Sequence, residues 1–376
     1  MGMVRTRFQP TDRSLWPEAG RDWDDWRWQM RNRLQSLEKI GPLIALSDDE
    51  QQACQATIGE FRLGLTPYYA SLIDTDDADC PIRLQAIPRM LELEVSSDEA
   101  SDPLAEERDM PVPGLTWRYP DRVLLYTSHQ CAVFCRHCTR RRKVSDPDSA
   151  PSKDQLNGAI RYISEHSQIR DVVLSGGDPL SLSNRRLAEV LRALRAIPHV
   201  EIIRIGTRHP VTLPQRVDEA LCAVLKEVQP VYVHTHFNHP RECTQEAFDA
   251  AARLADTGSV LGNQMVLLRG VNDRATVVQD LNRKLLMMRI RPYYMYQCDL
   301  SEGTSRFRVP LHRGLEILEA LRGHTSGMAV PHFVVDLPGG GGKVALSPDA
   351  VVEKNDDYWL LKSYSGEIVQ VPSGEG

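Results

Sequence analysis

From about residue 122 onward, short apolar runs alternate with stretches of helical periodicity. The runs are "RVLLYTS", "RDVVLSGG", "VEIIRIGT", "PVYVHTHF", "GNQMVLL" and "IRPYYMYQ", and from the second onward they begin about 30 residues apart, the length of one strand with its return helix. Helical patterns such as "NRRLAEVLRALRAI", "LPQRVDEALCAVLKEV" and "TQEAFDAAARLADTG" lie between them, and the last ends at a glycine stop. This alternation predicts an α/β fold with a parallel sheet covered by helices. Six such units are too few for an ordinary eight-stranded barrel, so we expect an open partial (β/α)6 barrel.

The two ends of the chain have different patterns. The stretch "DWDDWRWQMRNRLQSLEKI" places three tryptophans ahead of a Leu34/Leu37 stripe, which predicts an amphipathic helix that packs on the body or forms a subunit contact. The acidic stretch "EVSSDEASDPLAEERDMPVPG" is typical of a linker or an exposed loop. A seventh apolar run, "AVPHFVVDLPGGGGKVAL", is expected to extend the sheet or cap its edge. We therefore predict a helical N-terminal region over 1–115, a partial-barrel core over 116–300 and a C-terminal segment over 301–376.

Composition narrows the class of protein. The chain has 376 residues, of which 41% are hydrophobic, enough for a sizeable core. Its formal net charge of −6 argues against a general nucleic-acid binder. An apolar stretch of membrane-spanning length and an apolar signal core are both missing from the sequence, so we expect a cytoplasmic protein with reduced thiols and no membrane partner. Five dispersed cysteines are expected to be small buried hydrophobes: Cys54, Cys80, Cys222, Cys243 and Cys298.

The other three cysteines are gathered in "CAVFCRHC", directly after the first predicted strand. Thiolates from Cys131, Cys135 and Cys138 can hold a four-iron cluster by three of its irons, which leaves the fourth iron open to another ligand. A zinc site would need a fourth Cys or a His at the usual spacing. His137 is adjacent to Cys138, where joint ligation would strain the loop. We therefore predict an iron–sulfur site.

Further polar candidates also follow the predicted strands, and ligands of such sheets bind beyond the carboxyl ends of the strands. They are Ser175, Gly176, Gly177 and Asp178 in "SGGDPL", His236 and Asp299, and they are joined by Gln264 within the fifth apolar run. The cysteine triad together with "SGGDPL" resembles the radical S-adenosylmethionine enzymes. The resemblance implies that the open iron chelates S-adenosylmethionine, and that the two glycines let the backbone approach its methionine amino group.

The glycine-rich stretch "LPGGGGKV" invites a phosphate-loop interpretation, but its spacing rejects it. A Walker loop ending at Lys343 needs glycine where Leu337 stands and Ser or Thr where Val344 stands. A lysine on a glycine hinge is suited to condensing with an aldehyde, as in the binding of pyridoxal phosphate. Burial or a cationic neighbour should then lower the lysine pKa. Arg118 and Arg122 flank a predicted turn in "WRYPDRV", from which two guanidiniums can clamp a dianionic phosphate.

Taken together, these stretches resemble the lysine 2,3-aminomutase family over about residues 20–370. The matching stretches are "DWRWQMRNR", "WRYPDRVLL", "CRHCTRRRK", "HTHFNHP", "GNQMVLLRGVND", "YQCDLSEGTSRFR" and "FVVDLPGGGGK". The resemblance implies a radical S-adenosylmethionine core over 116–300 whose three cysteines ligate a [4Fe–4S] cluster. It also implies that the segment over 301–376 carries pyridoxal phosphate on Lys343. By the same match, Arg118, Tyr119, Arg122 and Gln264 would surround that coenzyme, while Tyr296 and His236 would line the S-adenosylmethionine side.

The substrate is indicated by an acidic pair. Asp299 and Asp336 match the family residues that hold the distal ammonium of lysine, and two buried carboxylates are costly to desolvate unless a cation joins them. Arg140 matches the residue that grips the substrate carboxylate. The resemblance thus implies an isomerase that interconverts L-lysine and L-β-lysine through a 5′-deoxyadenosyl radical and an imine between pyridoxal phosphate and substrate. Its electron donor would be of the flavodoxin or ferredoxin type.

The sequence also departs from the family and leaves alternatives open. It has no cysteine after Cys298, and Arg274 stands where a partner cysteine would follow "VND", so structural zinc is not expected. His234 and His236 form a pair without a visible third ligand. A homo-oligomer is expected, with the tryptophan-rich segment as one candidate contact. Three other functions stay open: the same chemistry on arginine, isomerisation of a lysine used to modify a translation factor, and a noncatalytic iron–sulfur regulator, which would need neither Lys343 nor the acidic pair.

Overall fold

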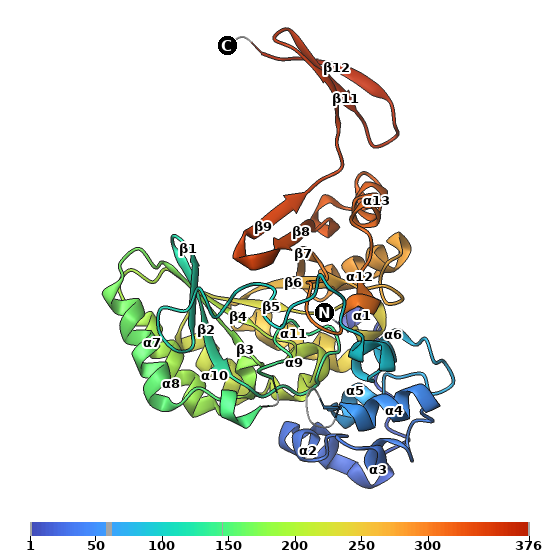
Figure 1. Cartoon of the computed structure of the whole chain (residues 1–376), viewed down its shortest axis with the longest axis vertical. Coiled ribbons are helices and arrows are strands. Elements are labelled where there is room, and N and C mark those ends of the chain that lie inside the picture. The colour runs from blue at the N-terminus through green and yellow to red at the C-terminus, as the bar shows by residue number, and fades with distance from the viewer. Residues whose placement is uncertain (1, 58–61, 145, 375–376) are drawn as a thin grey trace.

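A computed structural model describes residues 2–57, 62–144 and 146–374 of the chain. Strands β1 to β9 form one sheet in chain order, in which β2 to β8 run parallel while β1 and β9 are antiparallel to their neighbours (Figure 1). The strands are β1 (Leu115–Tyr119), β2 (Arg122–Ser128), β3 (Asp171–Gly176), β4 (Ile202–Gly206), β5 (Val231–Thr235), β6 (Val260–Leu267), β7 (Arg291–Gln297), β8 (His332–Leu337) and β9 (Gly342–Leu346). Because β1 and β9 stand at opposite ends of this order, the sheet is an open barrel. The predicted partial barrel is confirmed, and its six predicted strands are β2 to β7.

Helices cover the outer face of the sheet, as the periodicity predicts (Figure 1). The principal ones are α7 (Lys153–Glu165), α8 (Asn184–Arg195), α9 (His209–Thr212), α10 (Glu219–Glu227), α11 (Gln245–Asp256), α12 (Ala275–Met287) and α13 (Leu311–Leu321). In α8, Ser183 caps the first turn by accepting a hydrogen bond from the Arg186 amide, and Leu187, Leu191 and Leu194 are fully buried. These leucines recur at helical spacing, so one face of the helix packs on the core while the charged face meets solvent.

The N-terminal region is built from short helices rather than the continuous one predicted across the tryptophans. Its helices are α1 (Gly2–Arg5), α2 (Trp26–Arg31), α3 (Leu37–Ile40), α4 (Asp48–Ala56), α5 (Pro67–Ala70) and α6 (Pro81–Ala86), with a 3-10 helix η1 at Pro17–Asp24. Asp25 caps α2 by accepting from the Arg27 amide, which starts a new helix there. Leu34 then leaves helical geometry to exchange backbone hydrogen bonds with Leu65. Trp23 is fully buried, so the tryptophan-rich segment packs on the body.

The acidic stretch over 94–114 is a loop, as predicted, but much of it is not exposed. Glu106 is only 6% exposed, and Asp109 and Asp102 form ion pairs with arginines that lie near the open face of the barrel. The stretch therefore belongs to the wall of the barrel mouth and is not a free linker. Its acidic residues pair with arginines outside the stretch, including Arg140 with Glu106 and Arg142 with Asp102, and local composition cannot reveal these partners.

The C-terminal segment has two parts. The hairpin of β8 and β9 extends the barrel sheet, as expected for the seventh apolar run. Beyond it, β10 (Val351–Lys354), β11 (Tyr358–Lys362) and β12 (Ile368–Pro372) form a separate antiparallel sheet that projects from the body (Figure 1). None of the helices in the described part of the chain has the length and apolar character needed to cross a lipid bilayer.

Candidate functional site

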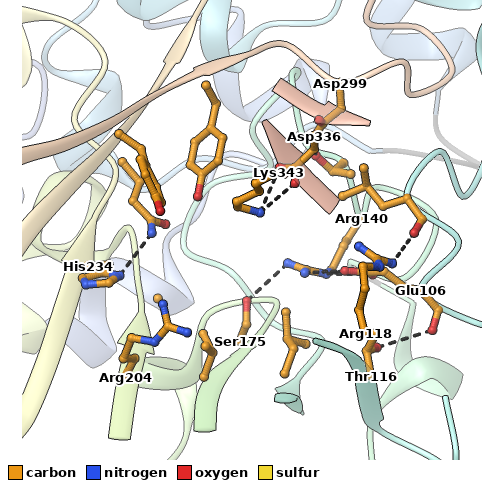
Figure 2. A pocket seen from close by; sticks show the side chains of 18 of the residues that line it. Glu106, Thr116, Arg118, Arg140, Ser175, Arg204, His234, Asp299, Asp336 and Lys343 are labelled. Atoms are coloured by element: carbon orange, nitrogen blue, oxygen red, sulfur yellow. Dashed lines mark hydrogen bonds and ion pairs between the residues drawn. The ribbon is translucent and has the colours of Figure 1, made fainter. Parts of the chain in front are cut away.

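An open cavity of about 420 Å³ lies inside the barrel, and most of the predicted site residues line it (Figure 2). These are Arg118, Tyr119, Arg122, Arg140, Ser175, His236, Gln264, Tyr296, Asp299, Asp336 and Lys343. They come from almost every strand between β1 and β9, so the fold brings together residues separated by more than two hundred positions. A parallel barrel has this effect because each strand delivers its side chains to a shared interior.

One part of the cavity is organised around Arg140, in the loop after β2. Its Nε donates to both carboxylate oxygens of Glu106 at 2.9 and 3.0 Å, and its Nη1 donates to Ser175 Oγ at 3.2 Å. Although burial alone would raise the pKa of Glu106, the guanidinium of Arg140 lowers it below its ordinary value. The pair therefore holds Arg140 as a fixed cation at the cavity wall. Glu106 was not predicted from the sequence.

A second part of the cavity is acidic. Asp299 accepts a hydrogen bond from Thr139 Oγ1 at 2.7 Å. The pKa of Asp299 is raised to about 6, first by burial and then by the nearby carboxylate of Asp336, against the opposing effects of the Thr139 hydrogen bond and of Lys343. A cation arriving beside these two carboxylates would relieve both their repulsion and the cost of desolvation.

Lys343 reaches this acidic part from β9. In the β8–β9 hairpin it stands directly opposite Asp336, and its Nζ donates to both Asp336 oxygens at 2.7 and 3.0 Å. Its backbone amide donates to the Tyr119 hydroxyl at 2.9 Å, and its Nζ lies 5.3 Å from the centre of the Tyr296 ring. The neighbour of the lysine is thus a carboxylate and not the expected cation. Its ammonium group occupies the position expected for the cationic end of a substrate.

The two arginines predicted to clamp a phosphate differ in their surroundings. Arg118 donates from Nε to Asp109 Oδ2 at 2.8 Å and from Nη2 to the Leu104 carbonyl oxygen. Arg122 instead stacks on Tyr119, with its guanidinium carbon 3.9 Å from the ring centre. Both guanidiniums line the cavity, and with the amine of Lys343 they supply the donor set that a phosphorylated aldehyde requires. The residues present therefore fit such a coenzyme.

Several cavity residues were missed at the level of sequence. Besides Glu106 and Thr139 they include Arg204, Tyr293 and Tyr294, while His234, considered from the sequence only as a metal ligand, also lines the cavity. Burial lowers the pKa of His234 to about 4, and its Nδ1 receives a hydrogen bond from the Gln264 amide at 3.1 Å. The available signal was the period of two along each strand, which places His234 with His236 and Tyr294 with Tyr296 on one face.

The loop after β2 carries the cysteine triad. The pKa of Cys131 is raised well above its ordinary value, first by burial and then by Asp178 and the other two thiols, and burial raises the pKa of Cys138 to about 11. Cys135 Sγ accepts a hydrogen bond from Arg208 Nη1 at 2.7 Å. Among the described residues, no group of His, Cys, Asp or Glu side chains converges as the ligands of a single ion must. A cluster that takes each sulfur on a different iron does not need that convergence, and a donor set of three neighbouring thiols fits it.

The end of β3 approaches the cysteine loop closely. Gly176 has φ +120°, and a Cβ on it would lie 2.6 Å from the Ser128 carbonyl oxygen; a Cβ on Gly177 would lie 2.6 Å from that of Gln130. Only glycine allows this contact. The carboxylate of Asp178 accepts hydrogen bonds from the Thr207 hydroxyl and the Arg208 amide, so it joins the segment after β3 to the start of α9.

His236 contributes a neutral imidazole to the cavity. Burial, with a further contribution from Arg208, lowers its pKa to about 4. At neutral pH its ring can therefore accept as well as donate a hydrogen bond.

Comparison with known proteins identifies two regions of the chain. Residues 125–281 match the model of the radical SAM superfamily, and residues 318–375 match a model described as lysine-2,3-aminomutase. The L-lysine 2,3-aminomutases of Fusobacterium nucleatum and Clostridium subterminale are 52% and 50% identical to 92% of this chain, which covers 82% and 83% of their lengths. A glutamate 2,3-aminomutase of Clostridioides difficile is 43% identical over 93% of this chain and 83% of its own length. Among solved structures, Streptococcus suis SuiB bound to S-adenosylmethionine superposes with a TM-score of 0.44 at 13% identity, over 58% of this chain and 51% of that one.

Proposed function

Because the chain belongs to the lysine 2,3-aminomutase family of the radical SAM superfamily, we propose that it is an isomerase that interconverts L-lysine and L-β-lysine. Membership in the superfamily implies a [4Fe–4S] cluster and S-adenosylmethionine as cofactors. The reaction moves the amino group from C2 to C3, so the protein must hold both ends of the substrate while leaving C3 open to a radical.

The observation that carries the proposal is the polarity of the cavity. Arg140 offers a fixed guanidinium to the α-carboxylate of an amino acid, while Asp299 and Asp336 offer carboxylates to a distal cation. A substrate with an anionic side chain would add charge to the acidic pair and would be repelled from it. This arrangement supports a cationic amino acid over glutamate.

Pyridoxal phosphate is the second coenzyme of the proposal. Lys343 would hold it through its amine, with Arg118 and Arg122 at the phosphate and Tyr119 and Gln264 beside the ring. When bound, this coenzyme supplies a π-system through which an amino group can migrate. Asp336, which accepts two hydrogen bonds from the Lys343 amine at 2.7 and 3.0 Å, would orient that amine toward the coenzyme.

The radical part of the site would be formed by the cysteine loop. Cys131, Cys135 and Cys138 would ligate three irons, and the close approach of Gly176 and Gly177 leaves backbone groups for the methionine end of S-adenosylmethionine. Tyr296 and His236 face the cavity that the two cofactors would share. We further propose a flavodoxin- or ferredoxin-type electron donor and a homo-oligomer without structural zinc, with the radical core over 116–300 and the lysine-bearing segment over 301–376.

The test is anaerobic incubation of the reconstituted protein with dithionite, S-adenosylmethionine, pyridoxal phosphate and single amino acids. The expected product is β-lysine from lysine, identified by chromatography and mass spectrometry. Formation of β-arginine alone would show that the substrate is arginine and not lysine. No product from either amino acid would favour a noncatalytic iron–sulfur regulator.

The matched control is Lys343→Ala. We expect this variant to lose both the absorbance of covalently held coenzyme and the formation of product, while its iron content stays unchanged. Retention of borohydride-reducible coenzyme would contradict the role of Lys343.

A further inference from the structure

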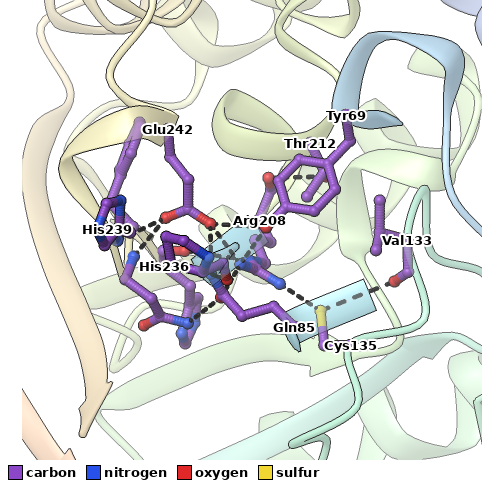
Figure 3. A network of polar contacts seen from close by, with 12 residues as sticks. Tyr69, Gln85, Val133, Cys135, Arg208, Thr212, His236, His239 and Glu242 are labelled. Carbon is purple, nitrogen blue, oxygen red and sulfur yellow. Dashed lines mark hydrogen bonds and ion pairs between the residues drawn. The ribbon is translucent and has the colours of Figure 1, made fainter. Parts of the chain in front are cut away.

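Arg208, at the junction between β4 and α9, reaches the cysteine loop through a buried polar network (Figure 3). Its Nη1 donates to Cys135 Sγ at 2.7 Å. Its Nε donates to the His236 carbonyl oxygen at 3.2 Å, and its Nη2 donates to Glu242 Oε1 at 2.7 Å and Gln85 Oε1 at 2.6 Å. Each nitrogen of the guanidinium therefore has a partner, and one of these partners is a predicted ligand of the cluster.

Glu242 fixes this geometry from the opposite side. Its side chain is fully buried, and it accepts hydrogen bonds from the backbone amides of Asn238 and His239 at 2.6 and 3.0 Å and from the Tyr69 hydroxyl at 2.7 Å. Rotation of Arg208 away from Cys135 would leave a buried carboxylate without its cation, which is costly. The guanidinium is thus held in place by an anion that is itself held by the backbone.

The three sulfurs do not have equivalent surroundings. Cys131 and Cys138 pack against the apolar side chains of Phe134 and Val144, whereas Cys135 receives a charge-assisted hydrogen bond. Hydrogen bonds to ligand sulfurs and nearby positive charge stabilise the reduced, more negative state of an iron–sulfur cluster. The hydrogen bond from Arg208 therefore falls on a sulfur atom where it would change the equilibrium between the oxidised and reduced cluster.

We propose that Arg208 sets the reduction potential of the cluster through its hydrogen bond to Cys135, with Glu242 as the anchor that aims and partly offsets its charge. Arg208 is a positioning residue, because it acts through a ligand and not on the substrate. The proposal rests on the iron–sulfur assignment in the proposed function and is independent of the amino acid that the protein transforms. A purely structural ion pair, by contrast, would leave the potential unchanged.

The experiment is a redox titration of the reconstituted cluster, followed by electron paramagnetic resonance in the absence of S-adenosylmethionine and substrate. For Arg208→Gln we expect the ratio of reduced to oxidised cluster at a fixed potential to fall about tenfold, a midpoint about 59 mV more negative for one electron. Arg208→Lys keeps the charge and should show a smaller shift. The control is Arg192→Gln, which removes the same charge from an exposed ion pair between Arg192 on α8 and Glu227 on α10 and should leave the midpoint unchanged.

Substitution of Glu242 should shift the midpoint potential in the opposite direction. Glu242→Gln removes the buried negative charge and should make the midpoint less negative than in the wild type. The double variant Arg208→Gln with Glu242→Gln keeps the network neutral, so its midpoint should lie between those of the two single variants.

With iron fully loaded, a midpoint in Arg208→Gln equal to that of the wild type would overturn the proposal, as would an unchanged midpoint in Glu242→Gln where Arg208→Gln fails to fold. Loss of the cluster from the Gln, Lys and double variants despite native circular dichroism would also overturn it, because all three cysteines remain. Failure of the proposed function is distinguishable, since it would appear as missing iron or missing product in the wild-type protein.

Discussion

Replacing Asp299 by asparagine is expected to stabilise the free protein and to weaken its hold on lysine. The carboxyl group is buried beside Asp336, and its pKa is raised from an ordinary 3.8 to about 6, first by burial. The folded protein therefore resists ionisation of this group, whereas the unfolded chain ionises it freely. Asparagine keeps the shape of the side chain and removes the charge.

The size of the effect follows from the two pKa values. Between pH 3.8 and about 6 the folded state retains a proton that the unfolded chain has lost, so the stability contributed by this group falls as pH rises through that window. At about 1.36 kcal/mol for each pH unit, the total loss is about 3 kcal/mol, of which about 1.6 kcal/mol has accrued by pH 5. The asparagine variant avoids this loss, so its advantage should be about 1.4 kcal/mol larger at pH 7.5 than at pH 5.

Urea unfolding of the cofactor-free wild type and variant at the two pH values measures this difference. Comparison between pH values cancels any effect of the amide on local hydrogen bonds, because that effect does not titrate. Asp256→Asn, which removes a charge from an exposed ion pair with Arg289, serves as the control and should show no such pH-dependent gain. With cofactors present, kcat/KM for lysine should fall about 30-fold or more, since removing one partner of a desolvated charge pair costs about 2–5 kcal/mol.

An advantage that is the same at pH 5 and pH 7.5 would refute the electrostatic argument, because it would show that Asp299 ionises in the folded protein as it does in the unfolded chain. Unchanged kcat/KM for lysine would separately refute its contact with the substrate cation.

Two other substitutions test the walls of the site. Glu106→Gln leaves the buried guanidinium of Arg140 without its anion and should lower the free energy of unfolding by about 3–5 kcal/mol above pH 4.5. This loss should become smaller as the pH falls below 4.5, because Glu106 then takes up a proton in the wild type. Equal stability of wild type and variant in urea at neutral pH would contradict the ion pair. Gly176→Ala should lower the free energy of unfolding by about 1–3 kcal/mol, because its Cβ meets the Ser128 carbonyl oxygen at positive φ. The matched control is Gly158→Ala, in α7 with open space around it, which should raise the free energy of unfolding by about 0.5–1 kcal/mol. Similar urea midpoints for the two variants would exclude the close approach at Gly176.

The sequence was most informative where a local rule fixes the outcome. The spacing of apolar runs predicted β2 to β7, and the order of a parallel sheet then predicted that His236, Gln264 and Asp299 would lie together, as they do in the cavity. Arg140 and Lys343 were assigned to the same site only by the family resemblance. Local rules failed where the partner of a charge lies far along the chain. Glu106 and Arg208 are ordinary surface charges by composition, and only the folded chain shows that one holds Arg140 and the other contacts Cys135.

The N-terminal region also makes contacts with a distant part of the chain that local sequence rules do not predict, and these contacts support the cysteine loop. Its broken helices leave carbonyl groups and acidic side chains facing the cysteine loop: the Gly64 carbonyl accepts from the Phe134 amide, and the buried Glu92 pairs with Arg136 at 2.6 Å. The region therefore acts as a support that holds the loop from outside the barrel.

The cysteine loop in turn would link the proposed cluster to the proposed substrate contacts. Thr139 and Arg140 follow Cys138 directly, and they contact Asp299 and Glu106. Consecutive Cα atoms are about 3.8 Å apart, so the last predicted cluster ligand lies within about 8 Å of backbone from the residues at both ends of the cavity. A displacement of the loop would move the cluster and the substrate contacts together. Radical chemistry at one carbon requires fixed distance and orientation, and under the proposed function a single supported loop would supply both.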